Sequence, residues 1–187
     1  MTVLAPLVQR RSPNQSSRRG TRVDLLVWHE TAGSYAGAVS WLCTPTRYDA
    51  RGNVVSGPDA SAHLVVREHG DEVTQLVPLG QKAWHAAEFN ARSVGVEHAN
   101  ITAKGYATDA QLRESARIFG WLCLHLRVPP RWARGGAGPG VCYHGELGQA
   151  GGGHPACGPD PSGWLRFLEL LHAEVRRGGY RTTWARD

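Results

Sequence analysis

The stretch Val23-Asp24-Leu25-Leu26-Val27-Trp28-His29-Glu30-Thr31-Ala32-Gly33 joins a short, strongly apolar run to a polar segment. An apolar run of this length, after an Arg- and Gly-containing segment, is typical of a strand that is buried on both faces. Open α/β sheets present functional groups at the ends of such central strands. We therefore predict a central strand over residues 23–28 that leads to a functional residue, His29; the alternative is a core histidine with satisfied hydrogen bonds.

Three further segments have the composition of strands. Residues 62–67 and 73–77 are β-rich runs separated by His69-Gly70-Asp71, which is the composition of a hairpin turn. Residues 93–97 form another short apolar run that ends in a carboxylate. We expect the first two segments to be antiparallel neighbours and the third to be a separate strand.

Helices are predicted from apolar spacing and from capping residues. Apolar residues recur at helical spacing over residues 35–42 and from about 108 to 127, where Thr108 begins a capping-box pattern. Asp160 as N-cap and Pro161 at the first helical position predict a last helix.

Residues 45–60 and 129–153 contain many turn-forming residues and little periodicity, so they predict long irregular loops. Strands that alternate with helices predict an α/β fold, a single domain with a central mixed β-sheet flanked by helices. A chain of 187 residues with 41% hydrophobic content suits one such domain. We expect a basic N-terminal arm over 1–22, the folded domain over 23–180 and a C-terminal tail over 181–187.

The formal net charge of +5 favours a polyanionic partner: nucleic acid, a membrane surface or an anionic cell-wall polymer. Residues 1–22 contain five arginines and no acidic residue, so they form either a solvated arm or a binding patch. Because the basic residues are dispersed and no nucleic-acid motif occurs, we expect no nucleic-acid partner.

No run approaches the roughly 18 apolar residues of a membrane span, and the first residues do not resemble a signal peptide. We therefore expect a soluble monomer without membrane insertion. The four cysteines, Cys43, Cys123, Cys142 and Cys157, form no C-x-x-C pair. A disulfide framework is not expected from this pattern.

Two histidines and a third residue could bind a metal. His29 and His144 each end an apolar run, and Cys157 and Asp160 both lie in the Gly- and Pro-containing segment after His144. Two imidazoles with one thiolate or carboxylate make a three-ligand zinc site with a position left for water, which is the catalytic pattern. The spacing by itself is weak evidence, since such a trio arises by chance in many chains.

Five short motifs occur in one order: residues 27–33, 61–66, 70–78, 83–86 and 93–97. In this order they closely resemble the type-2 N-acetylmuramoyl-L-alanine amidases, the superfamily that includes amidase-type phage lysozymes and animal peptidoglycan recognition proteins. The resemblance extends from about Val23 to Phe167.

The resemblance implies a zinc cofactor and a ligand set. His29 matches the first ligand, His144 the second and Cys157 the third, which in this family is Cys or Asp. Cys157 stands seven positions before Trp164, as the family's third ligand does, whereas Asp160 stands four positions before it. Asp160 also has another role available as the cap of the last helix.

The resemblance also implies the remaining site residues. Glu97 matches the carboxylate that polarises the reacting water; its alternative is a surface carboxylate. Side chains that match substrate-binding positions are Thr31, His63, Trp84 and His85.

The sequence departs from the family at two positions near the site. Many members have Tyr where Ala62 stands, so Glu97 would carry more of the catalysis. Pro155 occupies the place of a common lysine, so His154 is either its replacement as the group that stabilises the oxyanion or a surface-loop histidine.

The function implied is hydrolysis of the bond between N-acetylmuramic acid and L-alanine in bacterial peptidoglycan. Residues 23–180 would then be the zinc amidase catalytic domain of a phage endolysin, held in the host cytoplasm before lysis and acting afterwards on the cell wall. The alternatives are a cytoplasmic amidase that recycles muropeptides and a non-catalytic peptidoglycan-binding receptor.

Overall fold

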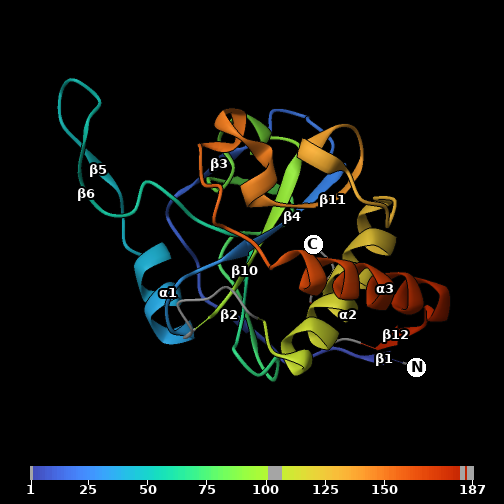
Figure 1. Ribbon diagram of the computed structural model, residues 1–187. Coiled ribbons are helices and arrows are strands. Elements are labelled where there is room, and N and C mark those ends of the chain that lie inside the picture. The colour runs from blue at the N-terminus through green and yellow to red at the C-terminus, as the bar shows by residue number, and fades with distance from the viewer. Residues whose placement is uncertain (1, 101–106, 182–183, 185–187) are drawn as a thin grey trace.

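The structure is a computed structural model that describes residues 2–100, 107–181 and 184 (Figure 1). Its centre is a six-stranded sheet in the order β11-β4-β10-β7-β8-β2. Only β7 and β8 pair antiparallel, so the sheet is mixed, as predicted. In sheet order the strands are Gly140–Tyr143, Leu25–Glu30, Ser93–His98, Leu64–Val66, Val73–Gln75 and Leu7–Gln9.

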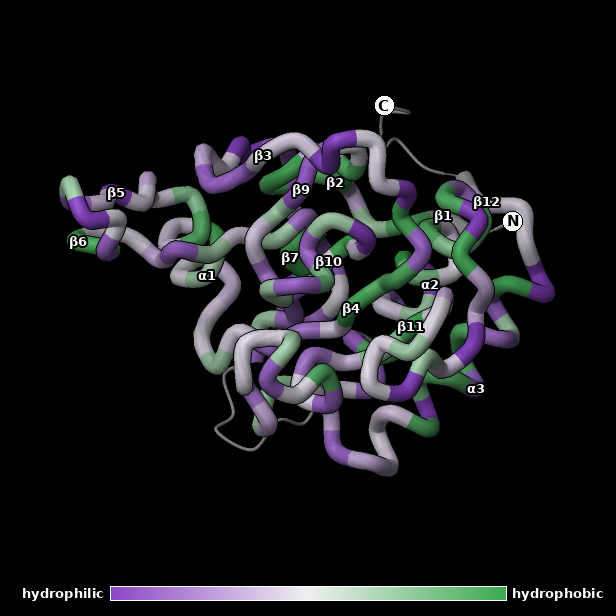
Figure 2. Tube along the Cα trace, turned by 90° about the horizontal axis from the view of Figure 1, so that it is seen from above, coloured by the Kyte–Doolittle hydropathy of each residue, from purple (hydrophilic) through white to green (hydrophobic). Residues whose placement is uncertain are grey.

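The strand β4 confirms the prediction of a buried central strand. It lies between β11 and β10, parallel to both, and its residues from Leu25 to Trp28 are fully buried. Figure 2 shows hydrophobic residues in β4 and β11 in the middle of the molecule. The strand begins at Leu25. The residue before it, Asp24, accepts a 2.7 Å hydrogen bond from Arg92 Nε.

Three helices flank the sheet, in the positions that the sequence predicts. They are α1 (Tyr35–Leu42), α2 (Asp109–Leu126) and α3 (Pro161–Arg177). The helices α2 and α3 pack on each other and on the sheet face that carries Leu26 and Trp28. The helix α1 packs in a separate apolar cluster with Val65 of β7. The opposite face of β4, with Leu25 and Val27, is covered by loop residues.

The predicted helix caps are present. Thr108 accepts a hydrogen bond from Gln111 N at 3.1 Å, and Asp160 accepts from Ser162 N at 2.9 Å. The side chain of Gln111 does not complete the capping box, because it donates to the carbonyls of Arg67 and Ala99.

The N-terminal segment, for which composition left open a solvated arm or a binding patch, forms strands that pair with the folded domain. β2 pairs with β8 in the central sheet, and β3 (Gln15–Ser17) pairs with β9 (Gln81–Ala83). Ser12 Oγ donates to Leu42 O at 2.6 Å, and Asn14 Nδ2 donates to Thr44 O at 2.9 Å. The polar residues of this segment therefore satisfy carbonyls at the C-terminal end of α1 and just after it.

Two short strands near the ends of the chain lie side by side (Figure 1). β1 (Thr2–Val3) pairs in parallel with β12 (Tyr180–Arg181), so the strand crosses the predicted boundary between domain and tail. Trp184 is buried and donates from its indole to Ala5 O at 3.0 Å. The rest of the predicted tail, residues 182–183 and 185–187, lies outside the described residues.

The two predicted loops contain short regular elements. Residues 45–60 carry a hairpin of β5 (Arg47–Tyr48) and β6 (Val54–Ser56), which projects from the body (Figure 1). Residues 129–153 contain β11 and several 3₁₀ turns. Among the described residues, no helix is both long and apolar enough to cross a membrane.

Arg18 joins the N-terminal segment to two distant loops. Its guanidinium is buried and donates to the carbonyls of Leu79 at 3.0 Å, Asn90 at 3.2 Å and Ala91 at 2.7 Å. Burial lowers the pKa of Arg18 to about 10, which leaves it charged at neutral pH.

We expect Arg18→Ala to lower the free energy of unfolding by about 3 kcal/mol, since each buried carbonyl left without a donor costs about 1–3 kcal/mol. Exposed Arg22 provides a matched control, because Arg22→Ala removes the same charge and should change stability by less than about 0.5 kcal/mol. Urea unfolding of the two variants measures the difference. Equal stabilities would show that Arg18 does not hold the segment in place.

Candidate active site

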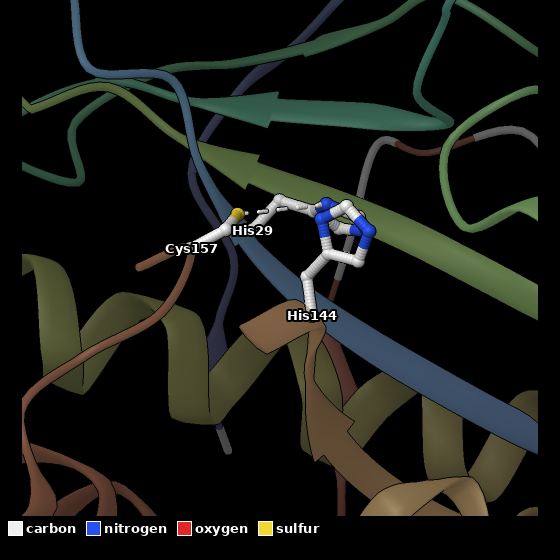
Figure 3. A group of neighbouring side chains, drawn as sticks. All are labelled: His29, His144 and Cys157. Atoms are coloured by element: carbon white, nitrogen blue, oxygen red, sulfur yellow. Dashed lines mark hydrogen bonds between the residues drawn. The ribbon is translucent and has the colours of Figure 1, made fainter. Parts of the chain in front are cut away.

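The side chains of His29, His144 and Cys157 point toward one another at the carboxyl edge of the sheet (Figure 3). His29 lies near the end of β4, His144 directly follows β11, and Cys157 lies in the loop before α3. One potential ligand atom from each residue lies within 4.8 Å of the other two. The structure thus brings together the three residues predicted as metal ligands.

Hydrogen bonds fix the orientation of both imidazoles. His144 Nε2 lies 2.8 Å from Gly151 O, and because a carbonyl only accepts, this nitrogen carries the proton and Nδ1 keeps a free lone pair. His29 Nδ1 lies 3.9 Å from Cys157 Sγ. Burial lowers the pKa of His29 well below 6.5, and neighbouring imidazoles lower it further. A neutral imidazole is the form that binds metals.

Cys157 is held by the backbone next to His29. Glu30 N donates to Cys157 Sγ at 3.4 Å. Burial, and then the nearby Glu97 carboxylate, raise the pKa of the Cys157 thiol to about 12. A coordinated divalent cation has the opposite effect and deprotonates a thiol. Two neutral imidazoles and a thiol at this separation match the donor set of a zinc site.

Glu97 lies beside this group. It is the register partner of His29 on the neighbouring strand β10, and its Oε1 lies 3.9 Å from His29 Nδ1. Glu97 Oε2 is buried and has no hydrogen-bond partner among the described residues. Burial, and then Glu30, raise the pKa of Glu97 to about 8. A buried carboxylate oxygen without a hydrogen-bond partner, beside three candidate metal ligands, fits a bound cation, which would favour the charged form of Glu97.

An open cavity of about 580 Å³ lies in front of the site. Four of the predicted catalytic and substrate-binding side chains line it, namely Glu97, Trp84, His85 and His154. The other lining residues are His29, Glu30, Asp59, Ala60, Ser61, Ala87, Asn90, His144, Gly151, Gly152 and Cys157.

Two residues predicted to bind substrate are not in the cavity. His63 is completely buried, with its Nδ1 accepting from Gly95 N at 3.0 Å. Thr31 Oγ1 donates to Gly33 O at 2.8 Å in a local turn. The His63 ring is thus enclosed by the protein, whereas Thr31 is half-buried and its hydroxyl proton is used within its own turn.

Sequence reasoning missed several lining residues. Ser61 lies in the same motif as His63 but two positions earlier, and it contributes to the cavity wall while its buried hydroxyl donates to Asn14 O. Glu30 directly follows His29 and adds a second carboxylate, whose pKa burial raises to about 7. Because Glu30 directly follows the candidate ligand His29 in the sequence, it could have been predicted as a site residue. Asp59 and Asn90 come from loops and carried no comparable signal.

Comparison with known proteins identifies the family. A family model described as N-acetylmuramoyl-L-alanine amidase matches residues 19–158. The chain therefore belongs to this N-acetylmuramoyl-L-alanine amidase family, as the five motifs predicted.

One curated relative is N-acetylmuramoyl-L-alanine amidase A of Achromobacter lyticus, which is 29% identical over 118 residues. The match covers 63% of this chain and 60% of that relative.

Solved structures share the fold. The hydrolase AmiA of Staphylococcus aureus, in complex with its ligand, superposes with a TM-score of 0.69 at 19% identity, covering 91% of this chain and 84% of that one. The endolysin N-acetylmuramoyl-L-alanine amidase LysCS of Clostridium intestinale gives 0.60 at 16% identity, covering 90% and 97%.

The structure separates the two candidates for the third ligand. Asp160 Oδ1 accepts from the backbone nitrogens of Ser162 and Gly163 at the start of α3, whereas Cys157 faces His29. We therefore expect Cys157→Ser to lose most bound zinc when the metal content of purified protein is measured.

Asp160→Asn is the matched control for that substitution. It should keep its zinc and lose about 1 kcal/mol or less of stability, as expected for a weakened helix cap. Zinc retained in Cys157→Ser but lost in Asp160→Asn would reverse the assignment.

Proposed function

We propose that this protein is a zinc-dependent amidase that hydrolyses the amide bond between N-acetylmuramic acid and L-alanine in bacterial peptidoglycan. The observation that carries the proposal is the convergence of His29, His144 and Cys157 next to Glu97 at the base of an open cavity. Membership of the amidase family and the name of the Achromobacter lyticus relative support the same reaction.

The cavity suits a small, polar segment of a polymer. Its volume of about 580 Å³ lies within the usual range of roughly 300–1,000 Å³ for ligand sites. Half-buried Asn90 and Trp84 offer an amide and an aromatic ring along its walls. Such groups can bind the sugar hydroxyls and peptide amides of a muramyl peptide.

A bound zinc ion would supply Lewis acidity that polarises the scissile carbonyl and acidifies water. Glu97 would take the proton from the water that attacks the lactyl carbonyl carbon. It would then deliver that proton to the alanine nitrogen as the carbon–nitrogen bond breaks. Proton transfer of this kind contributes about 10² to 10⁴ in rate.

His154 is the proposed donor to the oxyanion. It is exposed at the cavity, and its ring centroid lies 5.0 Å from that of His144. The position lets an imidazole N–H reach toward the reacting carbonyl from the side of the second ligand. One donor to an oxyanion contributes on the order of 10² to 10³ in rate.

We further propose that the protein acts as a phage endolysin, held in the host cytoplasm and released onto the wall at lysis. The structural likeness to LysCS and other endolysins and the +5 charge, which favours retention on anionic wall polymers, support this role. The alternative is an amidase that recycles soluble fragments. Higher activity on intact sacculi than on soluble muropeptides supports the endolysin, and the reverse supports recycling.

A non-catalytic receptor is the remaining alternative. Its ligand set would be incomplete, because relatives that only bind peptidoglycan usually lose the cysteine ligand. Here the imidazoles and the thiol lie together, which favours the enzyme.

We expect digestion of purified peptidoglycan to release new L-alanine amino termini without new reducing sugar ends. Chelation should abolish this release and added zinc should restore it, because water at neutral pH needs the metal to become a nucleophile. Amine labelling and a reducing-sugar assay measure the two products. New reducing ends without free amines, or full activity after chelation, would contradict the proposed reaction.

We expect Glu97→Gln to keep its zinc and its fold and to lose at least about a hundredfold in rate, as a metal hydrolase without its general base does. The exposed Glu88→Gln is a matched control that should keep the wild-type rate. Zinc content, circular dichroism and turnover are measured on both. Loss of zinc from Glu97→Gln would instead make Glu97 a metal-binding group.

A further inference from the structure

The imidazole of His85 lies between Ser93 and His29 on the site face of the sheet. We propose that Ser93 and His85 form a hydrogen-bond relay that fixes His29 as the Nε2–H tautomer, so that its Nδ1 lone pair is presented to the metal. His85 is then a positioning residue that acts through His29. The metal part of this inference rests on the proposed function, whereas the tautomer does not.

The direction of the relay is set at Ser93. Ser93 Oγ lies 2.8 Å from Phe89 O, to which it donates, and 3.0 Å from His85 Nε2. A serine hydroxyl has one proton, and the carbonyl of Phe89 can only accept it. Ser93 Oγ must therefore accept from His85, so His85 Nε2 carries a proton.

The second step follows from the first. His85 is buried among other imidazoles, where a neutral ring is favoured, and a neutral ring carries one proton. His85 Nδ1 is therefore an acceptor, and it lies 2.9 Å from His29 Nε2. His29 Nε2 must then be the donor.

The last step reaches the ligand atom. A neutral His29 that carries its proton on Nε2 has a bare Nδ1, and this nitrogen lies 3.9 Å from both Cys157 Sγ and Glu97 Oε1. His144 reaches the same state by a shorter route, since Gly151 O accepts its Nε2 proton. Both imidazoles thus keep a bare Nδ1.

The backbone around His85 is built to hold the ring in place. Asn90 Oδ1 accepts from the backbone nitrogens of His85 and Ala86 at 2.8 and 2.6 Å. A Cβ atom at Gly95 would lie 2.5 Å from His85 Nδ1 and 2.6 Å from its Cγ. The ring therefore lies directly against the backbone of β10, where a side chain at position 95 would collide with it.

Side chains along β10 point alternately to the two faces of the sheet, and this explains how one strand supports the whole relay. Ser93, Gly95 and Glu97 share a face of the strand, since successive side chains point to opposite faces. On that face Ser93 orients His85, Gly95 makes room for it, and Glu97 reaches the reacting groups. The glycine and the glutamate of the fifth motif thus have separate, complementary roles.

The first test is a direct observation of the tautomers. Long-range proton–nitrogen NMR spectra of apo-protein labelled with ¹⁵N-histidine distinguish protonated from bare ring nitrogens. We expect His29 and His85 both to be neutral with the proton on Nε2. A proton on Nδ1 of either ring would overturn the relay, whatever the catalytic activity of the protein.

The second test separates hydrogen bonding from packing. His85→Asn can place an amide oxygen near the position of Nδ1 and still accept from His29, whereas His85→Leu fills similar space without an acceptor. Groups that orient metal ligands typically contribute 10- to 100-fold in metal affinity. We expect His85→Leu to lose about that much zinc affinity in a chelator-competition assay, and His85→Asn to recover most of it.

The remaining outcomes are equally decisive. Equal zinc affinities in His85→Leu and His85→Asn would reduce His85 to a packing residue and overturn the proposal. In Ser93→Ala we expect the His85 signals to change from a pure Nε2–H tautomer to a mixture; an unchanged spectrum would exclude Ser93 from the relay. Correct tautomers in a protein that binds no zinc would instead contradict the proposed function and leave the relay intact.

Discussion

The parallel register of three neighbouring strands is the constraint on which the site depends. Backbone hydrogen bonds align Glu97 of β10 with His29 of β4, and the pairing of β11 with β4 ends at Tyr143 and Trp28, one residue before His144 and His29. Register partners in adjacent strands point to the same face. A slip of one residue in either pairing would send a functional side chain to the opposite face of the sheet.

Signals within a few residues of each other predicted much of the fold and of the metal site. The apolar run before His29 indicated a central strand because burial on both faces leaves no polar positions. Thr108 and Asp160 marked helix starts because their side chains satisfy free backbone amides of the first turn. Among the candidate ligands, His29 lies in one of the five motifs, whereas His144 was found at the end of an apolar run and Cys157 by its spacing from Trp164.

Features that depend on distant partners could not be predicted in this way. Ser12 and Asn14 have the composition of a solvated arm, yet their partners are carbonyls of Leu42 and Thr44. A polar side chain that faces water and one that satisfies a buried carbonyl look the same in sequence. His63 shows the same limit, since it was predicted to bind substrate, whereas its buried ring accepts from Gly95 N, which lies 32 residues further along the chain.

The two faces of β4 have different roles: one packs in the apolar core, and the other carries the candidate site. On one face Trp28 packs against Phe119 and Phe167, with ring centroids 6.1 and 5.0 Å apart, in the main apolar core. On the other face burial lowers the pKa of His29 and raises that of Glu97, so both groups are driven toward their neutral forms. Neutral groups can be buried at moderate cost, whereas a cation would restore the charge on Glu97 and is favoured by the bare nitrogens. The apolar face of β4 therefore offsets the cost of a buried polar site whose electrostatics the proposed zinc ion would complete.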